Sequence, residues 1–289
     1  MKTWILAITI IGCADKAENS SETQDTSTAT GTDTDTNQTT VDETTPEEIV
    51  STYEAGTYQI TDFALSEDSD IGLDIDGDGE IDNKLVSVLA AAALFTDIGQ
   101  AADINKILSE QIAKGDIVML SEMVHDTGDL TLDLLLGDID KDGNLFVDDN
   151  SYDENGDPNS RLSGAFVDQT NFAATSQYIE VPFPIMPDEP PVLIPLSMVT
   201  AEGSADDKGS DAIIGGAIPV EAFVNDIIDD LIPTGEEYDP ALYNDMERDE
   251  FMKWIWDFAS SPGVADITLA DGSPAVSAAV TFTATATAW

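Results

Sequence analysis

The last fifteen residues, AVSAAVTFTATATAW, constrain the fold more than any other feature, because from Ala278 every second residue is apolar and from Thr281 the residues between them are threonine up to Trp289. A period of two places successive side chains on opposite faces of a strand. The run therefore predicts a long strand with one apolar face. Shorter runs of the same period recur after residue 116, so the chain is expected to be β-rich.

Seven further strands are predicted from strand-like apolar runs, and four helices mainly from apolar residues spaced three or four apart. The strands are expected at 57–65, 117–124, 130–136, 162–167, 178–181, 192–200 and 212–218, and the helices at 85–95, 104–114, 219–231 and 245–259. Residues 182–195 carry six prolines and can form at most an edge strand or an extended connection, because proline lacks an N–H donor. The expected fold class is α+β, with antiparallel, sandwich-like sheets and about four helices.

The charge of the chain excludes some partners. It has 58 Asp and Glu against 10 Lys and Arg, a formal net charge of −48, while 42% of its residues are hydrophobic, which is normal for a folded protein. Nucleic acid and anionic headgroups are excluded as electrostatic partners because phosphate binding needs basic side chains. With one His and one Cys, the chain cannot build a Cys/His zinc site or an internal disulfide.

The N-terminus predicts a lipid anchor. One lysine precedes a short apolar stretch that ends in Ile10-Ile11-Gly12-Cys13, and this stretch is too short to span a bilayer. These residues resemble the signal of a bacterial lipoprotein. The resemblance implies cleavage after residue 12, diacylglyceryl transfer to the Cys13 thiol and an outer-membrane or cell-surface location, with a periplasm-facing orientation left open.

Its composition divides the chain into three expected segments. Residues 1–12 are the expected signal peptide. Residues 13–47 are rich in Thr, Ser, Asp and Glu and are expected to be a disordered tether, because they cannot bury enough apolar surface to offset the entropy of ordering. Residues 48–289 are the expected folded domain, with a possible subdivision near residue 127.

Two acidic loops, 67–82 and 138–157, carry the candidate chemistry. In the first, Asp74, Asp76 and Asp78 occupy positions 1, 3 and 5 of a twelve-residue loop. Glycine follows at position 6, Glu80 offers its carbonyl at position 7, and Asp82 stands at position 9. Oxygen ligands at this spacing, without His or Cys nearby, favour calcium.

The first loop resembles the calcium loops of EF-hands, dockerins and thrombospondin type 3 repeats. It departs from the EF-hand at position 12, where Leu85 replaces the bidentate carboxylate, and in the strand expected before it. The second loop has the same kind of spacing, with Phe146 at position 9. Its candidate ligands are Asp138, Asp140, Asp142, Asn144 and Asp149.

A third acidic segment contains Asp153, Asn155, Gly156 and Asp157. It either shares a second ion with Asp149 or forms an ordinary turn.

The folded part also resembles uncharacterised acidic lipoproteins of myxobacteria-like bacteria. The likeness rests on Tyr58-Gln59-Ile60, then GLDIDGDGEIDN, DINKIL, GDIVML and, later, GGAIP before a helix. It implies no known activity.

The expected function is that of a lipid-anchored, secreted calcium-binding surface protein. Its role would be structural or adhesive and non-enzymatic, with an unidentified protein or carbohydrate ligand. The alternative is a calcium-dependent extracellular hydrolase acting on polysaccharide, which would need a concave pocket with two carboxylates and aromatic walls. Trp254 and Trp256, two residues apart on a predicted helix, are either core residues or a contact platform.

Overall fold

The chain divides into two units, Met1–Pro46 and Glu47–Trp289. The computed structural model describes residues 55–92, 101–126, 128–183, 192–229, 232–235, 238–243 and 245–289, all in the second unit. The predicted signal peptide, Cys13 and tether lie outside the described residues.

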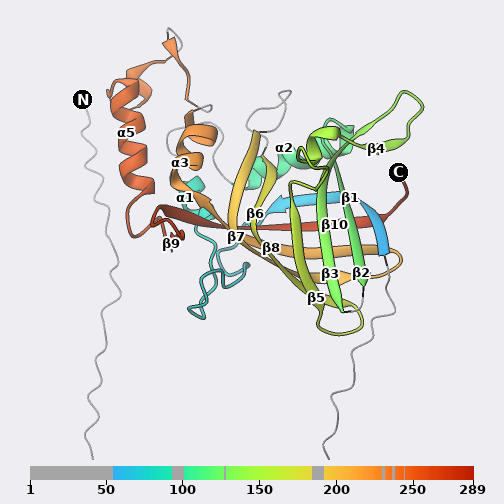
Figure 1. Ribbon diagram of the computed structural model, residues 1–289. Helices are drawn as coiled ribbons and strands as arrows, with labels where there is room; N and C mark the ends of the chain where they lie inside the picture. Colours follow the sequence, from blue (N-terminus) through green and yellow to red (C-terminus); the bar gives the residue numbers. More distant parts are fainter. Residues whose placement is uncertain are drawn as a thin grey trace, which may run out of the picture. The chain divides into compact units, whose positions relative to one another are not determined.

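Eight antiparallel strands close into a barrel (Figure 1). They are β1 (Ala55–Leu65), β2 (Val118–Asp126), β3 (Asp129–Ile139), β5 (Arg161–Phe166), β6 (Asn171–Phe183), β7 (Val192–Ala205), β8 (Gly209–Pro219) and β10 (Pro274–Ala286). Each pairs with the next in this order, and β10 pairs back with β1. Two short strands lie outside this circuit, β4 (Leu145–Val147) on β3 and β9 (Ile267–Thr268) on β10.

The predicted α+β sandwich is therefore wrong, although a strand was expected within or close to each of the eight barrel strands, for β6 only over its second half. The pairing of Tyr58 with Ala286 and of Leu65 with Val280 joins the first strand to the last. A sandwich keeps free edges on each of two sheets, whereas this contact leaves the circuit without an edge. The described helices are few, and the fold is mainly β.

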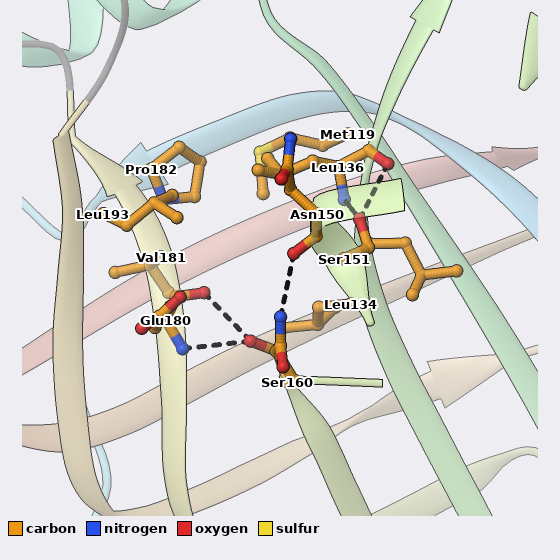
Figure 2. Close-up of a pocket in the computed structure, with 12 residues that line it drawn as sticks. Met119, Leu134, Leu136, Asn150, Ser151, Ser160, Glu180, Val181, Pro182 and Leu193 are labelled. Atoms are coloured by element: carbon orange, nitrogen blue, oxygen red, sulfur yellow. Dashed lines mark hydrogen bonds between the residues drawn. The ribbon is translucent and has the colours of Figure 1, made fainter. Parts of the chain in front are cut away.

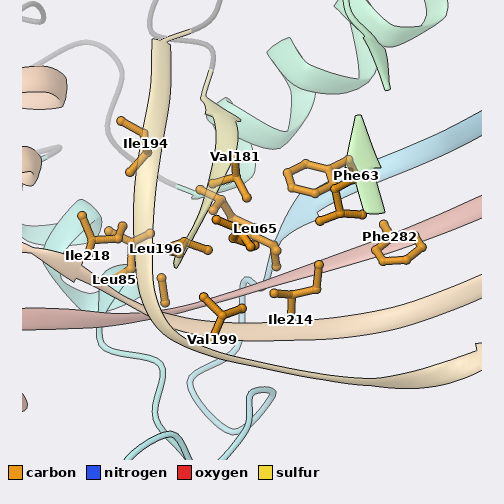
Figure 3. Packing of buried hydrophobic residues seen from close by; sticks show 14 of the residues in the cluster. Phe63, Leu65, Leu85, Val181, Ile194, Leu196, Val199, Ile214, Ile218 and Phe282 are labelled. Atoms are coloured by element: carbon orange, nitrogen blue, oxygen red, sulfur yellow. The ribbon is translucent and has the colours of Figure 1, made fainter. Parts of the chain in front are cut away.

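The barrel interior is a continuous apolar core (Figure 3). Along β10 the predicted alternation holds from Val280, since Val280, Phe282 and Ala284 are buried in this core while Thr281 and Thr283 are more exposed. From Ala275 to Val280 every residue is buried, so both faces of the strand are covered there. Facing strands contribute large side chains in the same way, including Phe63, Leu65, Val181, Ile194, Leu196, Val199 and Ile214. Burying apolar area on this scale is the main force that holds the barrel closed.

Helices pack against the same core. Their bounds are α1 (Leu85–Ala92), α2 (Ala101–Lys114), α3 (Val220–Ala222) continuing as a π-helix over Phe223–Ile228, and α5 (Arg248–Ala259), with single 3₁₀ turns at Asp149–Ser151 and Pro240–Leu242. Leu85, Ile104 and Leu108 bring α1 and α2 into the cluster, and Phe223 and Phe251 do so for α3 and α5. The helix predicted from Pro219 begins as expected, but it widens into a π-helix after one turn.

The segment between β4 and β5 fills a gap in the barrel wall, because β5 pairs with β3 only as far as Asp133. Beyond that point Leu136 donates its N–H to Ser151 Oγ at 2.8 Å, and Glu180 of β6 donates to Ser160 Oγ at 3.0 Å (Figure 2). A cavity of about 30 Å³ remains among these residues. The hydroxyls of Ser151 and Ser160 thus make hydrogen bonds where strand pairing is missing, and they attach the segment between β4 and β5 to the barrel.

Two further predictions concerned a possible domain boundary near residue 127 and the proline-rich stretch 182–195. Residue 127, the possible subdivision, lies between β2 and β3, which pair with each other from Val118 to Asp126. Of the proline-rich stretch, Pro182 and Pro195 lie in β6 and β7, beyond the points where β5 and β8 pair with those strands. Within the described residues, no helix has the length and apolar character needed to cross a membrane.

Candidate metal site

The first acidic loop brings three of its predicted ligands together. Ligand oxygens of Asp74, Asp76 and Asp78 lie within 4.8 Å of one another, and all three residues are exposed. The loop sits on the connection from β1 to α1, and a bridge between Leu73 and Asp82 closes its base. These three carboxylates could hold a metal ion.

Backbone donors fix the first carboxylate. Gly77 donates its N–H to Asp74 Oδ1 at 2.7 Å, and Gly79 donates to Asp74 Oδ2 at 2.9 Å. Both glycines have positive φ, +82° and +90°, a region that side chains with a Cβ rarely adopt. The positive φ explains why glycine stands at position 6 of the loop, and the glycine at position 4 is explained in the same way.

The other two carboxylates are held in the same manner. Asp78 donates its N–H to Asp76 Oδ1 at 3.1 Å, and Glu80 donates to Asp78 Oδ1 at 2.8 Å. A carboxylate oxygen has two lone pairs, so one N–H bond leaves capacity for a cation. The loop is thus pre-arranged to present oxygens to a common point.

Asp82, the predicted ligand at position 9, lies at the base of the loop. It is 8% exposed, and its Oδ2 accepts the N–H of Ile75 at 2.7 Å across the base of the loop. Burial raises the pKa of the Asp82 carboxyl, the hydrogen bond from Ile75 opposes this, and the negative charge of Asp76 adds to the rise. Asp82 therefore braces the loop from below and lies outside the exposed triad.

The loop is seated on the outer wall of the barrel. Ile75, between two of the triad carboxylates, is buried with Ala217 of β8, Ile267 of β9 and Ala275 of β10. Gly215 lies under the same loop, since a Cβ there would approach Leu73 Cβ tightly, at 3.2 Å, and meet Ile75 Cγ1 in ordinary contact at 3.4 Å.

The second loop is built as a closed hairpin. Asp138 and Ile139 continue β3 and pair with Phe146 and Leu145 of β4. The carboxylate of Asp140 turns back into the hairpin and accepts three hydrogen bonds. Its donors are the N–H of Asp142 at 2.8 Å, the N–H of Asn144 at 2.8 Å and the Asn144 side chain at 2.9 Å.

These bonds have an electrostatic consequence. Those from Asn144, side chain first and backbone second, lower the pKa of Asp140. Asp149 lies beyond β4, at the start of the 3₁₀ turn. Among the described residues, only one group of three or more acidic, His or Cys side chains lies close enough together to hold one ion. It is the Asp74 triad, which consists of Asp74, Asp76 and Asp78. The second ion site therefore stays a prediction.

The third segment repeats the closed arrangement. Asp153 Oδ1 accepts the N–H groups of Asn155 at 2.7 Å and Asp157 at 2.9 Å, and the Asn155 side chain donates to Oδ2 at 3.1 Å. These bonds lower the pKa of Asp153, the N–H of Asp157 most of all. Its geometry is that of an Asx turn, the simpler of the two alternatives.

A groove of about 670 Å³ crosses the outer face of β6, β7, β8 and β10. Glu202 and Asp211 line it, and Asp211 accepts a hydrogen bond from Ser204 Oγ at 2.9 Å. The aromatic residues that border it, Phe172 and Phe282, are only 1% and 2% exposed because their rings point into the barrel core. Two carboxylates are present, but these rings cannot serve as sugar-stacking walls.

The two tryptophans of α5 differ in their surroundings. Trp254 stacks on both Phe251 and Phe258, with ring centroids 5.8 Å and 5.9 Å apart. Trp254 and Trp256 are exposed to almost the same extent, 36% and 37%. They differ in that two neighbouring rings of α5 stack on Trp254.

Sequence reasoning missed the residues that support the first loop from a distance. Lys84 donates its N–H to Ser277 Oγ at 2.9 Å, and Ser277 in turn donates to Asp266 Oδ2 at 2.5 Å. These partners lie nearly two hundred residues along the chain, so no local pattern could identify them. Ile75 did carry a signal, since it is an apolar residue within a run of acids.

Comparison with known proteins adds no identity. No protein-family model, curated protein or solved structure matches the chain.

Proposed function

We propose that this chain is a lipid-anchored, secreted calcium-binding surface protein whose role is structural or adhesive and non-enzymatic. The observation that carries the proposal is the convergence of Asp74, Asp76 and Asp78 at the tip of a braced loop. An aspartate triad alone could hold several divalent ions. Calcium is the choice because the donors are all hard oxygens and Ca²⁺ tolerates the irregular, flexible geometry of such a loop better than Mg²⁺.

The expected affinity is modest. Calcium takes six to eight oxygens, and here Leu85 stands at position 12 while Asp82 is turned to the loop base. Backbone carbonyls and water must complete the shell. Extracellular calcium modules commonly bind at about 10⁻⁴ to 10⁻³ M, a range that suits a permanently occupied structural site outside the cell.

The test is the melting temperature of residues 13–289 carrying Cys13→Ser, measured in EDTA, in about 2 mM calcium and in magnesium at equal ionic strength. With a Kd of about 10⁻⁴ M, calcium at this concentration stabilises the folded form by about 2 kcal/mol. For a chain of this size, that raises the melting temperature by about 4 to 7 °C.

A matched pair of variants locates the effect. Asp76→Asn with Asp78→Asn should abolish the calcium-specific rise, whereas Asp62→Asn with Asp207→Asn removes the same charge elsewhere and should preserve it. Equal responses of the wild type to calcium and magnesium would refute the site. The acidic loops would then be solvated turns on an acidic coat protein.

The anchor is proposed from sequence alone. Cells fed a clickable fatty acid should label the full-length chain, and Cys13→Ser should lose the label. Retention of label in this variant would place the lipid elsewhere.

The hydrolase alternative gains little support. Its best place would be the groove with Glu202 and Asp211, but the aromatic rings beside that groove belong to the core. No observation on the described residues favours it over a binding role.

A further inference from the structure

Segment 72–84 presents the triad carboxylates, and it also contacts β9 and β10 on the barrel wall, nearly two hundred residues further along the chain. Its apolar contact is Ile75, 9% exposed, which packs with Ile267 of β9 and Ala275 of β10. Met198 and Leu269 pack partly against the same cluster.

Its polar contact lies at the end of the segment. Ser277, fully buried, receives the N–H of Lys84 on its Oγ. The same serine donates its N–H to Asp266 Oδ1 at 2.9 Å and its hydroxyl to Asp266 Oδ2. One buried side chain thus links the end of the loop segment to the residue just before β9.

The element held by these contacts has little strand pairing of its own. β9 has two residues and pairs with β10 only through Thr268 with Pro274 and Ile267 with Ala275. It follows α5 in the chain. A short strand at the end of a sheet is among the first elements to open locally, so its protection depends on the side chains packed over it.

We infer that metal binding at the Asp74 triad clamps β9 to the barrel. This inference rests on the proposed calcium site. Two of the ligands, Asp74 and Asp76, directly flank Ile75, whose N–H is held by Asp82. A cation that draws the flanking carboxylates to one point fixes Ile75 in its seat, while without a cation their repulsion loosens the tip. Binding and seating are therefore coupled, and the coupling is reciprocal.

The experiment is amide hydrogen exchange over residues 264–273, in EDTA, calcium and magnesium, with calcium binding measured in parallel by calorimetry on the same chain. In the wild type, calcium should slow exchange at Ile267 and Leu269 by about tenfold, within the usual range of coupling between sites. Magnesium should have less effect.

Three variants separate the clamp from the site. Ile75→Ala should bind calcium more weakly, by up to about tenfold as reciprocal coupling requires, and at saturating calcium it should lose most of the calcium-dependent protection of β9. Ile75→Val should show intermediate losses if the alanine variant folds poorly. Ile81→Ala, an exposed isoleucine of the same loop at 52%, should behave like the wild type.

The outcomes are distinct. Calcium binding with unchanged exchange at β9 overturns the clamp and leaves the proposed function standing. Absence of calcium binding in the wild type overturns both. Full protection in Ile75→Val and Ile75→Ala would show that the apolar seat does not transmit the effect, and the clamp would again be refuted.

Discussion

Replacing Arg161 should reveal how the barrel wall is held where strand pairing gives way to the inserted segment. Arg161 of β5 donates Nε and Nη2 to the two oxygens of Asp133 on β3, at 2.7 Å and 2.8 Å. The Asp133 side chain is only 4% exposed, and Glu122 of β2 stands directly opposite it. In Arg161→Met, a buried carboxylate would face a second carboxylate with no cation beside it.

The magnitude follows from this geometry. Breaking a fully buried ion pair by removing one partner costs about 3–5 kcal/mol. The Arg161 side chain is 41% exposed, so water reaches the pair and screens the loss. We therefore expect Arg161→Met to lower the free energy of unfolding by about 2 kcal/mol.

The assay is urea denaturation at neutral pH, with a second pair as control. Lys253 and Asp257 on α5 form an ion pair whose side chains are 72% and 60% exposed. Lys253→Met should change stability by at most about 0.5 kcal/mol. Adding Asp133→Leu to Arg161→Met should recover part of the loss, because no charge is then left buried. Equal effects of Arg161→Met and Lys253→Met would refute the reasoning.

Two further predictions concern the hairpins and the close approach of strands. Backbone N–H bonds from Asn171 and Thr170 lower the pKa of Asp168 to about 2. The folded-state pKa is thus below the unfolded one, so this stabilisation is present above about pH 4 and is lost as pH falls toward 2. Asp168→Asn should be less stable than the wild type at pH 7, and urea titrations should find the difference vanishing near pH 2. In Gly164→Ala, the new Cβ would lie 1.9 Å from the carbonyl oxygen of Ala173, so β5 and β6 must separate. A soluble variant with an unchanged circular dichroism melt would contradict this.

Local pattern predicted the strands of this barrel but not their closure. Alternation along 278–288 identifies a strand with one buried face, and the structure buries the inward side chains of β10 accordingly. Closure depends on Tyr58 meeting Ala286, more than two hundred residues away, and no period within either strand reports that contact. A sandwich and a barrel both bury one face of each strand, so the two give the same alternation.

Helix prediction was limited by context in a similar way. Phe223, Ile227 and Ile228 are buried as the helical pattern requires, but the backbone there has π-helical hydrogen bonding. The spacing of apolar residues reports which face is buried and does not resolve a change of one residue per turn.

The contrast between the two acidic loops shows which part of the metal site the sequence could reveal. Both have aspartates at positions 1, 3 and 5, glycine at position 6 and isoleucine at position 2. Ile75 in the first loop is 9% exposed, whereas Ile139 in the second is 42% exposed and pairs with Leu145 in a hairpin.

The difference at position 2 decides what the carboxylates do. Where β3 continues through the loop start, Asp140 is free to turn inward and close the hairpin with Asn144. Where the barrel wall holds Ile75 against Gly215 and Ala217, the flanking aspartates must point outward to a common side. The spacing of the candidate ligands can thus be read from the sequence. The convergence of their carboxylates depends on the packing of Ile75 against residues far along the chain.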